Sequence, residues 1–276
     1  MRPARWLGPE DCEGAARALD TEVSIGLPAA RVLVRRGMRG SGDAMRFLNP
    51  ALADMHDPWA LRGLPEAVER LRRAIAGRET ILIFGDYDVE GITSVVILKK
   101  GIEMAGGVAE FHVPHRLRDG YGMRPEAVET AAQRGIRLIV SVDTGIRAAK
   151  AVESAADLGI DVIITDHHLP DHELPPALAV INPNRHDCAY PEKNLCGAGV
   201  AFKLVHALLR GLDWPEAKLE RVLESFLKLV AIGTVADVAP LTGENRVIVK
   251  HGLRGLGSVR NPGLRALLDV AGFAAG

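Results

Sequence analysis

The sequence predicts an α/β fold with a doubly wound, mostly parallel sheet flanked by helices. From residue 80 onward, short runs of Ile, Val and Leu alternate with longer stretches of helical periodicity. The apolar runs lack polar alternation, which is typical of strands buried on both faces. Alternating strands and helices then indicate parallel strands joined by right-handed crossovers.

The first residues precede this alternation. Helical patterning covers residues 1–45 and is interrupted by Gly40-Ser41-Gly42, so we expect a small helical lead-in there and a larger domain over residues 46–276. The basic cluster Arg35, Arg36 and Arg39 is interpreted either as a solvated face or as a phosphate contact.

The elements of the larger domain follow in order. A helix is expected over residues 65–76, ahead of the first strand. Strands are expected at 80–84, 108–113, 138–142, 162–165 and 178–182, with helices at 92–105, 125–134 and 147–158 between them. Beyond residue 198 the pattern is helical, at 199–209, 215–230, 245–256 and 264–270.

Composition restricts the function classes. Hydrophobic residues make up 47% and charged residues 25%, and the net charge is −1, so nucleic-acid binding would require a local basic patch. No apolar run approaches the ~20 residues that span a bilayer, and the start of the chain lacks the order of a signal peptide, so we expect no membrane association.

The cysteines favour a reducing compartment. Cys12, Cys188 and Cys196 are odd in number and scattered, which indicates free thiols in a cytoplasmic protein. A zinc site of His186, Cys188 and Cys196 is not expected, because their spacing fits no common zinc template.

Acids and imidazoles follow the predicted strands. Asp86 and Asp88 follow the first strand, Asp143 the third, and Asp166-His167-His168 the fourth. Asp86 and Asp88 alone could form a solvated acidic turn, and a single strand-end Asp is usually a helix cap. However, ligands gather at the carboxyl ends of open parallel sheets, so the coincidence predicts a metal site.

Asp237 lies in an apolar segment, residues 231–241. A buried carboxylate without a partner costs several kcal/mol, so Asp237 should meet a cation if it is buried. The alternative is an acid on a solvated turn.

Four motifs, in order, resemble those of the DHH phosphoesterase superfamily. Within this superfamily, the sequence at residues 114–122 and 195–204 resembles that of the RecJ-like single-strand-specific exonucleases. The likeness runs from about residue 46 to the end. The four motifs are Gly85-Asp86-Tyr87-Asp88-Val89-Glu90-Gly91-Ile92-Thr93-Ser94, Val142-Asp143-Thr144-Gly145-Ile146, Asp166-His167-His168 and Gly233-Thr234-Val235-Ala236-Asp237.

The resemblance implies a DHH catalytic domain with phosphodiesterase activity. Such enzymes remove mononucleotides from the 5′ end of single-stranded DNA by two-metal in-line attack of water, usually with manganese, and magnesium also fits. Single-stranded DNA is the implied partner, with a single-stranded-DNA-binding protein or a helicase as further candidates. By position, the metal ligands are Asp86, Asp88, Asp143, His167 and Asp237, with Asp143 as the bridging carboxylate. Oxygen-rich ligation with one imidazole suits these ions better than zinc.

The remaining site residues also follow from the resemblance. His168 is assigned to the scissile phosphate and Asp166 to orienting an imidazole, although His168 could be merely structural. Arg116 and Tyr121 match positions that contact nucleic acid; otherwise they belong to an ordinary loop. Gly197 and Gly199 precede a helix that could face an anion, although small residues also allow close packing.

The sequence departs from the family pattern at three points. Phe84 stands where many relatives have histidine, so we expect two metal sites of unequal affinity. Glu90 stands where Asp is usual, outside the ligand positions, and we expect a tolerated change. The family's DHH-associated C-terminal domain and OB-fold are not expected within the 276 residues of this sequence.

Two rival functions remain open. One is a DHH phosphodiesterase for short oligonucleotides or cyclic dinucleotides, against which the text around Arg116 and Gly197 argues. The other is a non-enzymatic replication scaffold, against which the complete ligand set argues.

Overall fold

The computed structural model describes residues 12–120 and 122–273 and divides into two compact units, one ending at Asp54 and the other beginning at Met55. The described part of the first unit is helical, with α1 (Glu13–Val23), α2 (Leu27–Arg35) and α3 (Ser41–Leu48). Its small core is built from Ala16, Leu19, Ala30, Leu33, Val34 and Ala44. Residue 45, the expected end of the lead-in, lies within α3.

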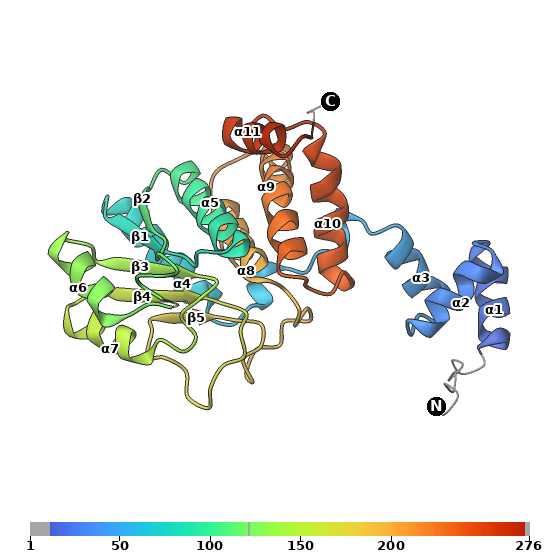
Figure 1. Ribbon diagram of the computed structural model, residues 1–276, viewed down its shortest axis with the longest axis horizontal. Coiled ribbons are helices and arrows are strands. Elements are labelled where there is room, and N and C mark those ends of the chain that lie inside the picture. Colours follow the sequence, from blue (N-terminus) through green and yellow to red (C-terminus); the bar gives the residue numbers. More distant parts are fainter. Residues whose placement is uncertain (1–11, 121, 274–276) are drawn as a thin grey trace, which may run out of the picture. The chain divides into compact units, whose positions relative to one another are not determined.

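The second unit contains a parallel five-stranded sheet, which confirms the predicted fold class (Figure 1). The strand order is β2-β1-β3-β4-β5, and each neighbouring pair is parallel. The strands are β1 (Thr80–Phe84), β2 (Val108–His112), β3 (Leu138–Val142), β4 (Asp161–Thr165) and β5 (Ala179–Ile181).

Helices cover both faces of the sheet. On one face, α4 (Leu64–Ala76), α5 (Val89–Met104) and α8 (Gly197–Arg210) contact one another and the strands. On the other, α6 (Pro125–Gln133) and α7 (Ala149–Asp157) enclose a core that includes Leu82, Ile139 and Val162. Because both faces are covered, the central strands β1, β3 and β4 are buried and mostly apolar, as the sequence indicated, whereas the edge strand β2 is largely exposed.

A helical layer completes the unit. It consists of α9 (Glu216–Ala236), α10 (Gly243–Leu256) and α11 (Pro262–Val270), and α9 packs against α5, α8 and α10. Short 3-10 turns lie at η1 (Leu52–Asp54) and η2 (Pro58–Ala60). Among the described residues, no helix combines the length and hydrophobicity needed to span a bilayer.

Two helices have an end that lies three or more residues from the prediction. The α5 helix begins at Val89 rather than residue 92, because the Asp88 side chain caps it by accepting a hydrogen bond from the Gly91 amide at 2.8 Å. The α9 helix continues to Ala236 rather than residue 230, so Asp237 becomes its C-cap residue.

The strand order places a switch point between β1 and β3. From β1 the chain crosses to β2 at one side and then returns to β3 at the other. In open α/β sheets, ligands bind in the crevice outside such a point. Asp86 follows β1 and Asp143 follows β3, so both lie at this crevice.

Candidate metal centre

Asp86 and Asp88 are held by the turn that joins β1 to α5. Asp86 is 5% exposed, and its Oδ1 accepts a hydrogen bond from the Tyr87 amide at 2.7 Å. A Cβ atom at Gly91 would lie 2.6 Å from the backbone oxygen of Asp86. The turn therefore requires glycine at this position to keep Asp86 in place.

Asp143 leaves β3 in a left-handed conformation, with φ of 59°. Its amide donates to the Thr165 carbonyl at 2.9 Å, which joins the end of β3 to β4. The side chain is almost completely buried, and its Oδ1 atom has no hydrogen-bond partner among the described residues. A Cβ atom at Gly197 would collide with this oxygen, so glycine there leaves room for the carboxylate.

Asp166 organises the two histidines that follow β4. Its Oδ1 accepts hydrogen bonds from the amides of His167 and His168, and lies 2.7 Å from the His168 Nδ1 atom. Its Oδ2 accepts from the Ile146 amide at 2.9 Å. Asp166 thus lies where it can orient the His168 imidazole.

Asn182 and Asn184 support the same segment from the loop after β5. Asn182 Nδ2 donates to the His168 carbonyl at 2.8 Å, and Asn184 Nδ2 donates to the His167 carbonyl at 2.6 Å. The Asn184 amide donates to Asn182 Oδ1 at 2.7 Å, so the two asparagines form one scaffold under the histidines.

The ligating atoms converge in three overlapping groups. Within each group, one potential ligand atom from every residue lies within 4.8 Å of the others. The groups are Asp86, Asp88 and Asp143; Asp143, His167 and His168; and Glu90, His167 and Asp237. We refer to Asp86, Asp88, Glu90, Asp143, His167 and Asp237 together as the acidic edge.

The acidic edge fits divalent cations. His167 Nε2 is buried without a hydrogen-bond partner among the described residues, and lies 3.4 Å from Asp143 Oδ1, itself without one. Buried polar atoms are rarely left unpaired, so such a pair points to a group that bonds to both. Carboxylate oxygens with imidazole nitrogen are a donor set suited to manganese or magnesium.

Electrostatics lead to the same conclusion. Burial raises the pKa of Glu90 and of Asp143, and neighbouring carboxylates raise both further. Burial, opposed by the Tyr87 hydrogen bond and assisted by the Asp88 charge, also raises the pKa of Asp86. These carboxyl groups repel one another in their charged forms, and a cation between them would relieve the repulsion.

The pKa shifts of His168 and Asp166 instead favour the charged form of each group. The hydrogen bond to Asp166 raises the pKa of His168, so the imidazolium form is favoured. Burial pushes the pKa of Asp166 upward, but its bonds to His168 and to backbone amides outweigh this and lower it overall.

A pocket of about 750 Å³ opens beside these residues. Asp86, Asp88, Asp166 and His168 form its acidic and imidazole wall. Basic and apolar residues line the rest, namely Arg116, Arg147, Met123, Ile146, Ala148 and Leu169, together with Tyr87, Gly122, Thr144 and Gly145.

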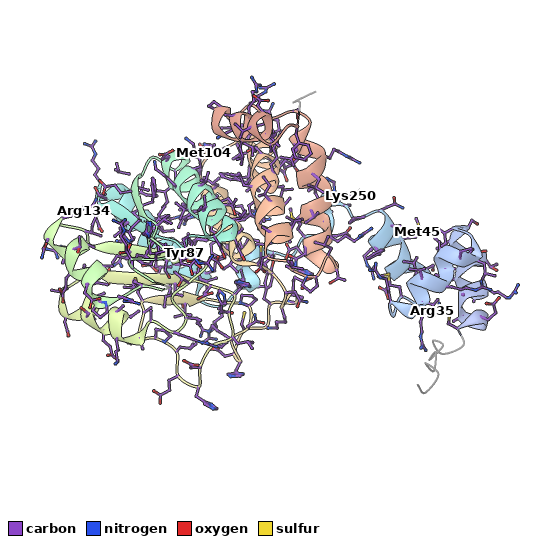
Figure 2. The ribbon with its side chains drawn as sticks, viewed as in Figure 1. Arg35, Met45, Tyr87, Met104, Arg134 and Lys250 are labelled. Carbon is purple, nitrogen blue, oxygen red and sulfur yellow. The ribbon has the colours of Figure 1, made fainter. Side chains whose placement is uncertain are left out.

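Arg116 and Tyr87 meet at this pocket. The Arg116 guanidinium lies over the Tyr87 ring, 5.3 Å from its centre. Tyr87, labelled in Figure 2, lies in the turn between β1 and α5, next to the acids that follow β1. The predicted contact residue Tyr121 lies outside the described residues.

The other predicted positions have defined surroundings. Gly197 and Gly199 are both buried, and a Cβ atom at Gly199 would collide with Leu195, so close packing requires both glycines. Asp237 is exposed rather than enclosed by apolar side chains, yet its carboxylate reaches Glu90 and His167. Phe84 is buried and stacks on His112 with ring centres 5.2 Å apart. The substrate role of the two glycines stays a prediction.

Sequence reasoning missed several residues at the site. Asn182 and Asn184 follow β5, so the rule that identified the other strand-end residues would have found them. Tyr87 lies inside the first motif and Arg147 directly follows the second, but no sequence pattern distinguishes either as a site residue. Glu90 was placed outside the ligand positions, whereas the structure brings its carboxylate to His167 and Asp237.

Comparisons with known proteins agree with this geometry. Residues 80–234, more than half of the chain, match the family described as DHH family, N-terminal domain. The single-stranded-DNA-specific exonuclease RecJ of Bacillus subtilis is 39% identical over 268 residues, which cover 97% of this chain and 33% of that protein. The chain therefore spans about a third of the length of this relative.

Solved structures are also similar. RecJ from Thermus thermophilus in complex with Mn²⁺ matches with a TM-score of 0.77 and 33% identity, covering 95% of this chain and 36% of that one. The Mg²⁺ complex of RecJ from the same organism matches with a TM-score of 0.66 and 29% identity, covering 95% and 33%.

Proposed function

The chain belongs to the DHH family, and we propose that it is the catalytic domain of a metal-dependent exonuclease that hydrolyses single-stranded DNA from its 5′ end. The observation that carries this proposal is that Asp143 Oδ1 and His167 Nε2 lie 3.4 Å apart at the switch point of the sheet, both buried and both without a hydrogen-bond partner among the described residues. The similarity to RecJ proteins, one of which is solved in complex with Mn²⁺ and with Mg²⁺, supports both substrate class and cofactor.

Two divalent cations are proposed, with manganese preferred and magnesium as an alternative. Asp86, Asp88 and Asp143 would hold one side of the site, and Asp143 with His167 the other, where Asp237 meets His167 in a neighbouring group. When bound, such a pair lowers the pKa of water and neutralises charge on the attacking and leaving oxygens of an in-line phosphoryl displacement. Asp143 is central because it belongs to both groups of acidic-edge ligands.

His168 is proposed to act on the scissile phosphate. It is half exposed and lines the pocket, whereas His167 is mostly buried beside Asp143. The Asp166 carboxylate holds the imidazole at Nδ1 and favours its cationic form, leaving Nε2 to meet developing negative charge on a phosphate oxygen.

The substrate is proposed to lie in the adjoining pocket. Arg116 and Arg147 provide the positive charge that phosphates require, although the chain as a whole carries a net charge of −1. The Tyr87 ring under Arg116 offers a surface for a base or ribose.

The setting is proposed to be the cytoplasm. Cys12, Cys188 and Cys196 are all free, as expected in a reducing compartment. A single-stranded-DNA-binding protein or a helicase would supply the exposed strand.

Hydrolysis of 5′-labelled single-stranded DNA tests the proposal. We expect manganese-dependent release of mononucleotides by the parent chain, loss of release in Asp143→Ala, and parental release in the control Asp157→Ala, which removes an exposed acid of α7. Activity that survives in Asp143→Ala would contradict the site assignment.

A second arm separates the rival functions. Preferential hydrolysis of dinucleotides or cyclic dinucleotides over long strands would favour the short-substrate phosphodiesterase. Manganese binding without hydrolysis of either substrate would favour the non-enzymatic scaffold.

A further inference from the structure

Glu90 occupies an unusual position for a glutamate. It lies in the first turn of α5 and is 3% exposed. A buried carboxylate is costly unless a cation or hydrogen-bond donors compensate it. Its surroundings therefore indicate what it does.

One compensating group is the start of α8. The Gly197 amide donates a hydrogen bond to Glu90 Oε1, across 107 positions of sequence. This bond fixes the carboxylate at the point where α5, α8 and the Asp143 side chain meet, because Gly197 also packs directly against Asp143.

The other contacts of Glu90 are to metal-ligand candidates. His167 Nε2 lies 3.6 Å from Glu90 Oε1 and 3.4 Å from Asp143 Oδ1, so it stands between two carboxylates. Both distances are too long for good hydrogen bonds, and Nε2 makes none to the described residues. Asp237 completes the group within 4.8 Å.

These separations suit ligands of a shared ion. With metal–oxygen bonds of ~2.1 Å, adjacent octahedral ligands lie roughly 3 Å apart and opposite ones roughly 4.2 Å apart. The separations of 3.4 and 3.6 Å from His167 Nε2 fall between these values. In addition, Asp143 is 1% exposed, and its Oδ1, which has no hydrogen-bond partner among the described residues, lies 3.4 Å from the same His167 nitrogen.

We propose that Glu90 is a direct ligand of the cation held by Asp143, His167 and Asp237. This inference rests on the proposed function, since it adds a ligand to the same metal centre. A third carboxylate at this ion adds negative charge and should tighten binding of a hard divalent cation. The hydrogen bond from Gly197 orients the carboxylate in the way that ligating groups generally require.

Calorimetric titration of the metal-free chain with Mn²⁺ tests the proposal. In Glu90→Gln the side chain keeps its size and can still accept the Gly197 hydrogen bond, but it loses its charge. We expect the affinity for one ion to fall at least tenfold. The matched control is Glu103→Gln on the same helix, where the carboxylate pairs with Lys99 and Lys100, and its affinity should be parental.

Asp143→Asn separates this inference from the proposed function. If Glu90→Gln binds Mn²⁺ as the parent does while Asp143→Asn does not, the role of Glu90 is overturned and the proposed function stands. If both variants bind as the parent does, both proposals are overturned.

A crystal structure of the parent chain grown with Mn²⁺ gives a test that does not depend on folding of a variant. A Glu90 oxygen within bonding distance of an ion, roughly 2.0–2.6 Å for hard cations, supports the proposal. A Glu90 carboxylate that contacts only the Gly197 amide overturns it.

Discussion

The acidic edge and the region around Lys203, in the middle of α8, both contain buried charged side chains, but the charges are neutralised differently. At α8, Lys203 is completely buried, pairs with Glu244 and donates to the His56 carbonyl at 2.7 Å. Glu244 also accepts hydrogen bonds from the Tyr190 hydroxyl at 2.6 Å and from the His56 amide at 3.2 Å. We call Lys203, Glu244 and Tyr190 the lysine cluster.

Backbone amides donate to Asp86, Asp88 and Glu90 of the acidic edge, but they do not compensate all of its buried polar atoms. Its carboxylates face one another and His167, and both Asp143 Oδ1 and His167 Nε2 are without hydrogen-bond partners among the described residues. The lysine cluster supports the fold, whereas we propose that the acidic edge is completed by a bound cation. The comparison shows that buried charged groups indicate a functional site where the protein supplies no group to neutralise them.

The largest effect is expected at the acidic edge, where a substitution should abolish activity without lowering stability. Asp143→Asn should reduce manganese-dependent hydrolysis more than about 1000-fold, equivalent to roughly 4 kcal/mol in the barrier. Asn tolerates the left-handed backbone at this position. Because burial and neighbouring carboxylates already disfavour the charged form of Asp143, a neutral amide there should leave the metal-free free energy of unfolding unchanged or higher in a denaturant titration. A large loss of metal-free stability would contradict the comparison.

The converse is expected at the lysine cluster. Lys203→Met leaves Glu244 buried without its cation and should lower the free energy of unfolding by about 3–5 kcal/mol. Chemical denaturation measures this change. The Mn²⁺ affinity of the folded variant should remain parental, and a selective loss of that affinity would show that the two regions are coupled.

Mn²⁺ should stabilise the lysine-cluster variant as it does the parent, but not the acidic-edge variant. Mn²⁺ at 100 times its dissociation constant should raise the free energy of unfolding by about 2.7 kcal/mol in the parent. The same increment is expected for Lys203→Met, whereas Asp143→Asn should show little. Denaturation with manganese or with a chelator gives the comparison.

Asn182 is a fully satisfied polar group within the metal site, so it combines features of both regions. Asn182→Ala removes the donor to the His168 carbonyl and should lower the turnover number about tenfold through misplacement of the imidazole. The Michaelis constant and Mn²⁺ affinity should change less, because the side chain itself touches neither. Equal losses in all three parameters would indicate general unfolding of the segment.

The smallest effect is a difference in pH dependence. Burial raises the folded pKa of Glu90 and of Asp143 above their unfolded values, so the metal-free folded state retains protons that the unfolded state loses. Its stability should therefore fall as pH rises from 6.5 to about 9, by the order of 1 kcal/mol per pH unit. Saturating Mn²⁺ should remove most of this slope.

Beside the lysine cluster, the contribution of His206 to the free energy of unfolding changes with pH in the opposite direction. Burial lowers the pKa of His206 to about 4, so the folded state binds fewer protons than the unfolded state between pH 4 and 6.5. Its contribution to stability increases over that range as pH rises. Replacing His206 with glutamine should flatten the acid limb of the pH profile and leave the limb above pH 6.5 unchanged.

The sequence alone determined the sheet and most of the site. Continuous apolar runs identified the strands, and the acids and imidazoles that follow β1, β3 and β4 were expected to share a crevice because parallel strands place their carboxyl ends at one edge. The strand-end residues Asp86, Asp143 and His167 follow from local pattern in this way.

Only the tertiary structure decided which other side chains join them. Glu90 meets Gly197 across 107 positions, and Asp237 reaches the same ligand group from the end of α9. Such contacts depend on how α5, α8 and α9 pack, and helix packing follows from side-chain shape over whole faces rather than from local spacing. For that reason the sequence located the edge of the sheet where we propose metal binding, while the fold decided which further side chains meet there.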